Sequence, residues 1–147
     1  MTGARSVPTV QLRSEDYPAD EGWRLLDWCL RRGADEFSLA FPGPPYLPST
    51  AWAAVDELLA PFRRRVASAG DRWALNGETM AVLRAVLPGG PFATAPGASP
   101  PDGLTVYRGG EALLRIVRRE GMGVLRLRHD EAPSLERAGL PFRPNAR

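Results

Sequence analysis

The sequence predicts one α+β domain, with about four helices and a mixed or mostly antiparallel sheet that ends in a three-stranded meander. The chain has 147 residues, of which 44% are hydrophobic, and a chain of this size can bury one substantial core. Apolar residues recur at helical spacing before residue 88, whereas three short runs of β-forming residues follow residue 103. No internal repeat or second core divides the sequence, so we expect a single domain over residues 1–147.

The N-terminal part combines a polar segment with an amphipathic helix. Residues 1–15 show no period, which leaves a flexible arm and an edge strand from Thr9 to Leu12 as alternatives. A helix is predicted over residues 20–32, and Gly33 suits the left-handed position that ends such a helix. Its apolar face consists of Trp23, Leu26 and Leu30.

Two short strands are expected on either side of a second helix. Phe37, Leu39 and Phe41 alternate with more polar residues, as in a half-buried strand, and prolines follow them directly. Trp73 and Leu75 are compatible with another short strand. The order strand, helix, strand then allows one right-handed crossover unit.

The second helix is predicted to start at Ser49 or Thr50 and to close at Gly70. Pro61 removes a backbone hydrogen bond within this segment, so we expect a kink or break there. Residues 63–65 are three arginines near the expected C-terminus, where the helix dipole favours cations. The buried stripe would consist of Trp52, Val55, Leu59, Phe62 and Val66.

A third helix and a long loop follow. Asn76 and Gly77 form a turn signal, and Met80, Leu83 and Val86 or Leu87 outline a short helix. Residues 88–103 are rich in proline and glycine and show no period. Loops of this length are either functional or disordered, and a solvated connector is the simpler interpretation.

The C-terminal third is predicted to hold the meander and a last helix. The three runs are 104–107, 112–117 and 124–127; the middle one also suits a helix, and we favour a strand. Asp130 can then cap a final helix that reaches Gly139, with Pro133 in its first turn. We expect the tail, residues 141–147, to be loose coil.

Composition indicates the source and the compartment. All 19 basic residues are arginine, as expected for a GC-rich bacterial genome rather than for a nucleic-acid-binding protein as such. The N-terminal residues contain no apolar stretch of signal-peptide length, and no later segment approaches a membrane span. We therefore expect a small soluble protein of the bacterial cytoplasm, a compartment with which the single Cys29 agrees.

The charges are distributed unevenly along the chain. Residues 1–60 hold five arginines and nine acids, a net charge of −4, whereas residues 61–147 hold fourteen arginines and eight acids, a net charge of +6. Such a dipole orients partners through its summed field. It favours a partner protein with surfaces of opposite sign, and it also permits head-to-tail self-association into a homo-oligomer.

The densest basic stretch contains the candidate binding residues. Arg126 and Arg128 would share one face of a strand, because side chains alternate. Together with Arg108 and Arg115 they would hold an anion or a nucleic-acid phosphate through guanidinium forks. The alternative, a solvated sheet face in a lysine-free sequence, is favoured because only Tyr107 offers a nearby stacking surface.

Three aromatic residues are further candidates for contacts. Trp28 lies five residues beyond Trp23 and is either a core residue or a partner anchor on the surface. Tyr46 lies within the proline-rich segment 42–48, a second potential contact surface. Phe92 is the one large apolar residue of the long loop and is a candidate anchor.

No catalytic centre, metal site or cofactor is predicted. Cys29 and His129 are the only candidates for a nucleophile and base pair, but nothing in the sequence brings them together, and structural roles are favoured. The carboxylate pairs are sequence neighbours that do not converge, so a metal site is not expected.

These observations rank three hypotheses. The first is a non-enzymatic module that binds another protein, such as an immunity-like, regulatory or accessory subunit, without contact to a membrane. The second is binding of nucleic acid or another anionic ligand through Arg115, Arg126 and Arg128. The third is a small-molecule enzyme with a pocket under the 88–103 loop, where Arg108 or His129 would contribute polar contacts.

Overall fold

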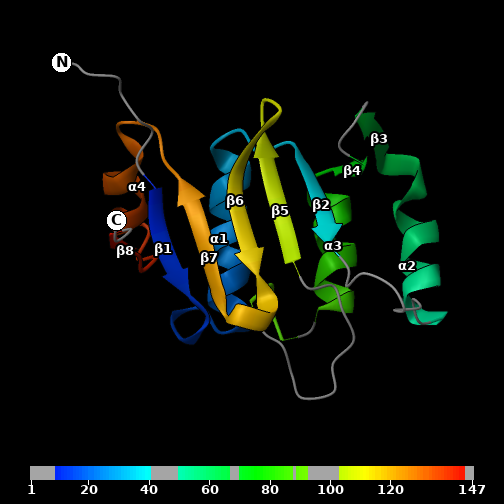
Figure 1. The fold of residues 1–147 in the computed structure, drawn as a ribbon, viewed down its shortest axis with the longest axis horizontal. Helices are drawn as coiled ribbons and strands as arrows, with labels where there is room; N and C mark the ends of the chain where they lie inside the picture. Colours follow the sequence, from blue (N-terminus) through cyan, green and yellow to red (C-terminus); the bar gives the residue numbers. More distant parts are fainter. Residues whose placement is uncertain (1–8, 41–49, 67–69, 88, 93–102, 145–147) are drawn as a thin grey trace.

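The strands of the described residues join one antiparallel sheet of eight strands in the order β3-β4-β2-β5-β6-β7-β1-β8 (Figure 1). The structure, a computed structural model, describes residues 9–40, 50–66, 70–87, 89–92 and 103–144. The strands are β1 (Thr9–Arg13), β2 (Glu36–Ala40), β3 (Arg63–Val66), β4 (Gly70–Ala74), β5 (Gly103–Arg108), β6 (Glu111–Val117), β7 (Met122–Arg126) and β8 (Arg143–Pro144). The helices of the described residues are α1 (Ala19–Arg31), α2 (Thr50–Leu59), α3 (Gly77–Val86) and α4 (Glu131–Arg137). The predicted α+β class, with four helices and an antiparallel sheet, is confirmed.

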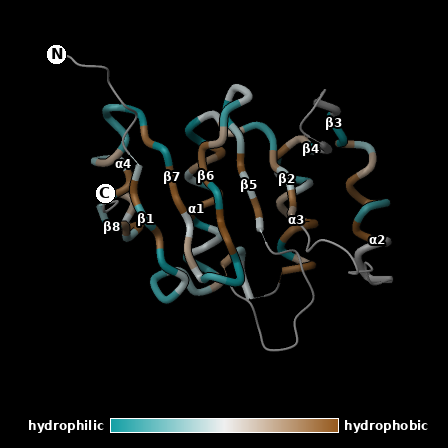
Figure 2. Tube along the Cα trace, viewed as in Figure 1, coloured by the Kyte–Doolittle hydropathy of each residue, from teal (hydrophilic) through white to brown (hydrophobic). Residues whose placement is uncertain are grey.

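The helices leave one face of the sheet uncovered. In Figure 1, α1 and α3 lie behind the sheet, α4 lies behind β1, and α2 lies beside the β3 edge. Figure 2 shows hydrophobic and hydrophilic positions alternating along the central strands. The apolar set, which includes Val106, Leu114 and Leu125, is buried and belongs to the same core cluster as Leu26 of α1. The opposite face, called the open face below, carries the polar set.

The locally encoded elements are as predicted. The first helix ends at Arg31, and Gly33, just beyond its C-cap Arg32, has a φ of 98°, the left-handed conformation that favours glycine. The strands β5, β6 and β7 are neighbours in the sheet, so the meander is confirmed and its ambiguous middle run is a strand. Asn76, expected in a turn, instead caps α3: its side chain accepts hydrogen bonds from the Glu78 and Thr79 amides at 2.9 and 3.0 Å.

The predicted second helix is too long. It ends at Leu59, and a single 3-10 turn that contains Pro61 leads into β3. Residues 63–65 are therefore strand residues paired with β4, not cations at a helix C-terminus. Because β3 supplies an extra reversal of the chain, β2 and β4 run antiparallel and the predicted crossover unit is wrong. The side chains of Trp52 and Val66 lie outside the described residues.

Both ends of the described chain are more ordered than expected. Residues 9–13 form an interior strand between β7 and β8, rather than an edge strand or an arm. The expected loose tail contributes β8, which pairs with Val10 and Gln11. Residues 145–147 lie outside the described residues.

The start of the long loop packs tightly against α1. Gly90 has a φ of 96°, and a Cβ built there would lie 2.7 Å from the Ala19 Cα. Phe92 is 1% exposed and stacks on Tyr17 with ring centroids 5.1 Å apart. These contacts fix residues 89–92 to the core, whereas residues 88 and 93–102 lie outside the described part of the chain.

Candidate functional site: the arginines of the open face

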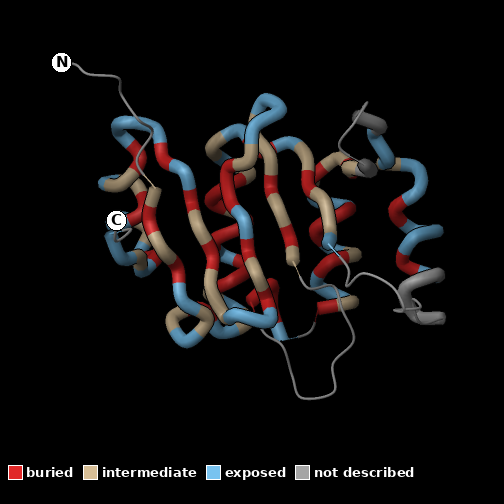
Figure 3. The backbone as a smooth tube through the Cα atoms, viewed as in Figure 1, coloured by how far each residue is buried: buried red, intermediate tan, exposed pale blue. Residues whose placement is uncertain are grey.

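The open face divides into two halves of different electrostatic character. Figure 3 shows exposed and half-buried residues along the strands that face the viewer. On the side of β2 and β4 two arginines share one counter-charge: Glu36 lies 3.1 Å from the Arg64 Nη1 and 3.5 Å from the Arg72 Nη1. The Arg72 guanidinium also lies over the ring of Tyr107 at 3.6 Å from its centroid. Arg64 and Arg72 are therefore both engaged by neighbouring residues of the sheet.

On the side of β6 and β7, three of the described arginines form no ion pair. Arg115 and Arg126 are exposed on the open face, and Arg128 is exposed just beyond the end of β7. Among the described residues, none of these three side chains makes an ion pair or a hydrogen bond. Arg115 is paired with Val124 across the strands, so Arg126 is its diagonal neighbour. The unpaired charges therefore lie close together.

An apolar groove is lined by two of these arginines, Arg115 and Arg126. It has a volume of about 270 Å³, and its lining combines apolar side chains in the floor with two guanidinium groups. The residues that line it are Thr9, Ala112, Leu113, Leu114, Arg115, Val124 and Arg126. The groove can therefore accept an apolar group whose neighbouring anion reaches Arg115 or Arg126.

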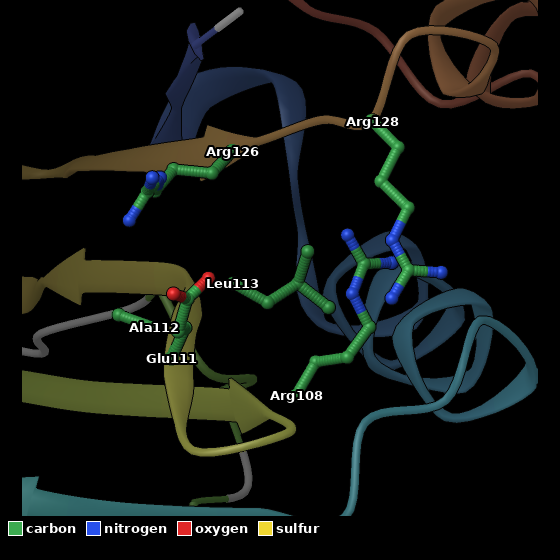
Figure 4. A pocket seen from close by; sticks show the side chains of 6 residues that line it. All are labelled: Arg108, Glu111, Ala112, Leu113, Arg126 and Arg128. Atoms are coloured by element: carbon green, nitrogen blue, oxygen red, sulfur yellow. The ribbon is translucent and has the colours of Figure 1, made fainter. Parts of the chain in front are cut away.

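Beyond the groove, β6 and β7 separate and leave a second cavity, called the fork below. Pairing between the two strands stops at Leu114 and Leu125, and a bulge opposite Val106 places Leu113 as an extra residue in β6. The fork has a volume of about 170 Å³ (Figure 4). It is lined by Arg108, Glu111, Ala112, Leu113, Arg126 and Arg128. Three of the predicted binding arginines thus border one cavity.

Arg108 differs from the other two arginines because it belongs to a buried ionic network. It donates from Nη1 and Nη2 to the Glu131 carboxylate at 2.8 and 3.1 Å, a bidentate pair, and from Nη1 to the Arg32 carbonyl at 3.2 Å. Arg32 Nε donates to the same carboxylate at 3.0 Å, and the Arg128 amide does so at 2.7 Å. Glu131 is only 1% exposed, so this network fixes α1, β5 and α4 to one another.

The network sets the ionisation of two buried groups. Burial alone would raise the pKa of Glu131, but hydrogen bonds from Arg108, the Arg128 amide and Arg32 outweigh it and lower this pKa to about 2. The nearby Cys29 is fully buried, and desolvation raises the pKa of its thiol to about 12. Cys29 therefore stays a neutral thiol, not a nucleophilic thiolate.

Acid should remove the contribution of Glu131 to stability. Its pKa is about 2 in the folded chain against 4.5 for the free group, so the contribution is complete above pH 4.5 and is lost as the pH falls toward 2. We expect the unfolding free energies of the wild type and a Glu131→Gln variant to converge over this range by about 3 kcal/mol. Urea unfolding of both proteins at several pH values measures this; a constant difference would contradict the assignment.

Two of the three aromatic residues predicted as contact residues are buried in the structure. Trp28 is 3% exposed and its indole nitrogen donates to Ser134 Oγ at 3.0 Å, so it is a core residue and not a surface anchor. Phe92 anchors its segment to the core and is not available to a partner. Tyr46 lies outside the described residues.

The proposed nucleophile and base are not brought together. Cys29 is buried beside the Glu131 network, whereas His129 is exposed, and no hydrogen bond joins them. Within the described residues, no group of three or more His, Cys, Asp or Glu side chains could hold a metal ion. In the same part of the chain, no helix has the length and apolar character that a membrane crossing requires.

Glu131 is the site residue that the sequence did not reveal. In the sequence, Glu131 belongs to one of several pairs of adjacent carboxylates, and nothing in the pairing distinguishes it from the others. Its partners Arg32 and Arg108 lie 99 and 23 residues away along the chain. The one local signal is its position at the start of α4, where the Arg128 amide lies within reach. Neither protein-family models, nor curated proteins, nor solved structures match this chain.

Proposed function

We propose that this chain is a binding protein, and that the β6–β7 half of its open face contacts an acidic surface of another protein. The observation that carries the proposal is the set of exposed arginines that form no ion pair among the described residues: Arg115 and Arg126 line the apolar groove, and Arg128 lines the adjoining fork. Elsewhere on the same face the structure pairs its arginines, as Arg64 and Arg72 do with Glu36. Unpaired cations beside an apolar floor suit a partner that brings carboxylates and apolar side chains together.

A protein partner fits this face better than a nucleic acid. Binding of single strands needs exposed aromatic rings on which bases stack. The guanidinium of Arg72 already covers one face of the Tyr107 ring, and the Tyr107 hydroxyl is hydrogen-bonded to Ser38 Oγ at 2.9 Å. Tyr107 is therefore engaged within the sheet and does not offer the arginines a free ring for base stacking.

The enzyme hypothesis receives less support. Burial keeps the Cys29 thiol protonated, since its pKa is raised to about 12, and His129 is exposed and makes no hydrogen bond to it. Arg108, the other polar group assigned to that hypothesis, is held by Glu131 and the Arg32 carbonyl. Most of the loop that would cover the pocket, residues 93–102, lies outside the described residues.

Partner capture with two charge-matched double variants tests the proposal. Immobilised wild-type protein is expected to capture one stoichiometric acidic protein from the source organism, with yield falling as salt rises. Arg115→Gln with Arg126→Gln should reduce the yield at least about tenfold, because both charges face the partner. Quantitative mass spectrometry of the eluates measures the yield.

The control removes the same charge from the helical side. Arg31 of α1 and Arg137 of α4 are exposed and lie outside the groove. Replacing both by Gln should leave capture within twofold of wild type. Equal losses in the two double variants, or unchanged capture in both, would contradict the assignment of the partner to the open face.

A further inference from the structure

We infer that the fork between β6 and β7 is a binding site for the phosphate group of a small organic phosphate monoester. This goes beyond the protein-binding proposal, because the site is complete within one chain and needs no partner. Its components are the cavity of about 170 Å³, three arginines around it, and the apolar groove that adjoins it.

The charge balance of the fork calls for a dianion. Its lining contains Arg108, Arg126 and Arg128 against the single carboxylate of Glu111, a net charge of +2. Glu131 compensates part of the charge of Arg108, but Arg32 binds the same carboxylate, so the three residues together keep one net positive charge and the balance stays at +2. A phosphate monoester carries close to two negative charges at neutral pH. A bound phosphate monoester would therefore neutralise the positive charge of the lining, whereas a ligand with a single carboxylate would leave half of that positive charge uncompensated.

The donors come from separate parts of the chain. Arg108 ends β5, Arg126 ends β7, and Arg128 lies between β7 and α4. Figure 4 shows Arg108 and Arg128 extending toward one another at one end of the cavity, with Arg126 and Glu111 at the other. A carboxylate is satisfied by one guanidinium fork in its plane, whereas the two guanidinium groups of Arg108 and Arg128, which come from different directions, suit the several terminal oxygens of a tetrahedral group.

One of these donors is held in place before any ligand arrives. The Arg108 guanidinium is fixed by Glu131 and by the Arg32 carbonyl, which occupy Nη1 and one hydrogen of Nη2. Its Nε and the remaining Nη2 hydrogen have no acceptor among the described residues. Because Arg108 is immobilised by the fold, binding there costs less conformational entropy than binding by three free side chains.

The adjoining groove indicates what the phosphate is attached to. The two cavities share Ala112, Leu113 and Arg126, and the groove continues over Val124 with a mainly apolar lining. An apolar or aromatic group on the phosphate can lie there while the phosphate remains in the fork. We therefore expect phenyl phosphate to bind more tightly than inorganic phosphate.

Titration of the purified full chain with three probes tests the site. The probes are phenyl phosphate, inorganic phosphate and acetate at pH 7.5, and the readout is the shift of the arginine Nε–Hε signals in ¹H–¹⁵N spectra. We expect saturable shifts of Arg108 and Arg128 with both phosphates, with phenyl phosphate binding at least about threefold more tightly, and no saturation with acetate. Acetate binding as tightly as phosphate, or no saturation with any probe, would overturn the inference. Equal affinity for the two phosphates would overturn the assignment of the groove to the organic group.

Three variants separate the site from general charge effects. Arg128→Gln should weaken phenyl phosphate about tenfold, and it is preferred to a change at Arg108 because Arg128 is exposed and its loss leaves Glu131 paired. Glu111→Gln should tighten binding about threefold by removing the repelling carboxylate. Arg31→Gln removes one charge from the helical side and should change binding less than twofold. A loss in Arg31→Gln equal to that in Arg128→Gln would overturn the site.

The probes report on the fork whether or not a partner protein exists. Phosphate binding without partner capture would contradict only the proposed function, whereas capture without phosphate binding would contradict only the inference.

Discussion

Replacement of Glu131 by Gln is expected to lower the free energy of unfolding by about 3 kcal/mol, among the largest effects of any single charge-removing change in the described chain. The carboxylate is 1% exposed and accepts bonds from the Arg108 and Arg32 guanidinium groups and the Arg128 amide. Gln is similar in size but carries no charge, so Arg108 keeps its burial and loses the charge that compensates it. Urea unfolding at pH 7 measures the difference.

Glu136 supplies the matched control for this change. It lies on the same helix and is exposed, so Glu136→Gln should alter the unfolding free energy by less than about 0.5 kcal/mol. A loss in the Glu131 variant as small as that in the control would mean that the network contributes little to stability.

Replacement of Phe92 by Ala is expected to cost about 3 to 4 kcal/mol of stability. The ring is 1% exposed, stacks on Tyr17, and lies against Gly123, where a built Cβ would be 3.2 Å from the Phe92 Cε1. Removing it leaves a cavity between the sheet and residues 89–92. Thermal and urea unfolding of the variant give the cost.

Leu58 provides the comparison for Phe92. It is 59% exposed on α2, so Leu58→Ala should change stability by less than about 0.5 kcal/mol. If Phe92→Ala were instead as stable as the wild type and lost the captured partner, Phe92 would be a contact residue, contrary to its burial.

The elements that could be predicted from the sequence are those encoded by local spacing. The apolar residues of α1 and α3 recur with the helical period, and the β5–β7 meander corresponds to short runs of β-forming residues separated by glycines. The errors involve pairing between distant segments. Residues 63–66 became a strand through pairing with β4, and β1 became an interior strand because Arg143 and Pro144 pair with it from the far end of the chain. Such pairings leave no local pattern.

The same distinction between local patterns and contacts between distant residues explains why only part of the candidate site could be predicted. Arg126 and Arg128 alternate with apolar residues, from which the sequence predicts one shared strand face; in the structure β7 ends at Arg126, and Arg128 lies beyond it, but both residues line the fork. The role of Arg108 could not be inferred, because it depends on Glu131 and on the carbonyl of Arg32, which lies 76 residues away. Burial of Trp28 likewise depends on contacts from α4, which supplies Ser134.

Site-specific photo-crosslinking tests most directly the claim that the open face is the binding surface. A photo-reactive side chain at Val124, in the floor of the groove, is compared with one at Glu136, on the helical side. We predict that the captured acidic protein is crosslinked from position 124 and not from position 136. Crosslinking from position 136 alone would place the partner on the helices and contradict the account.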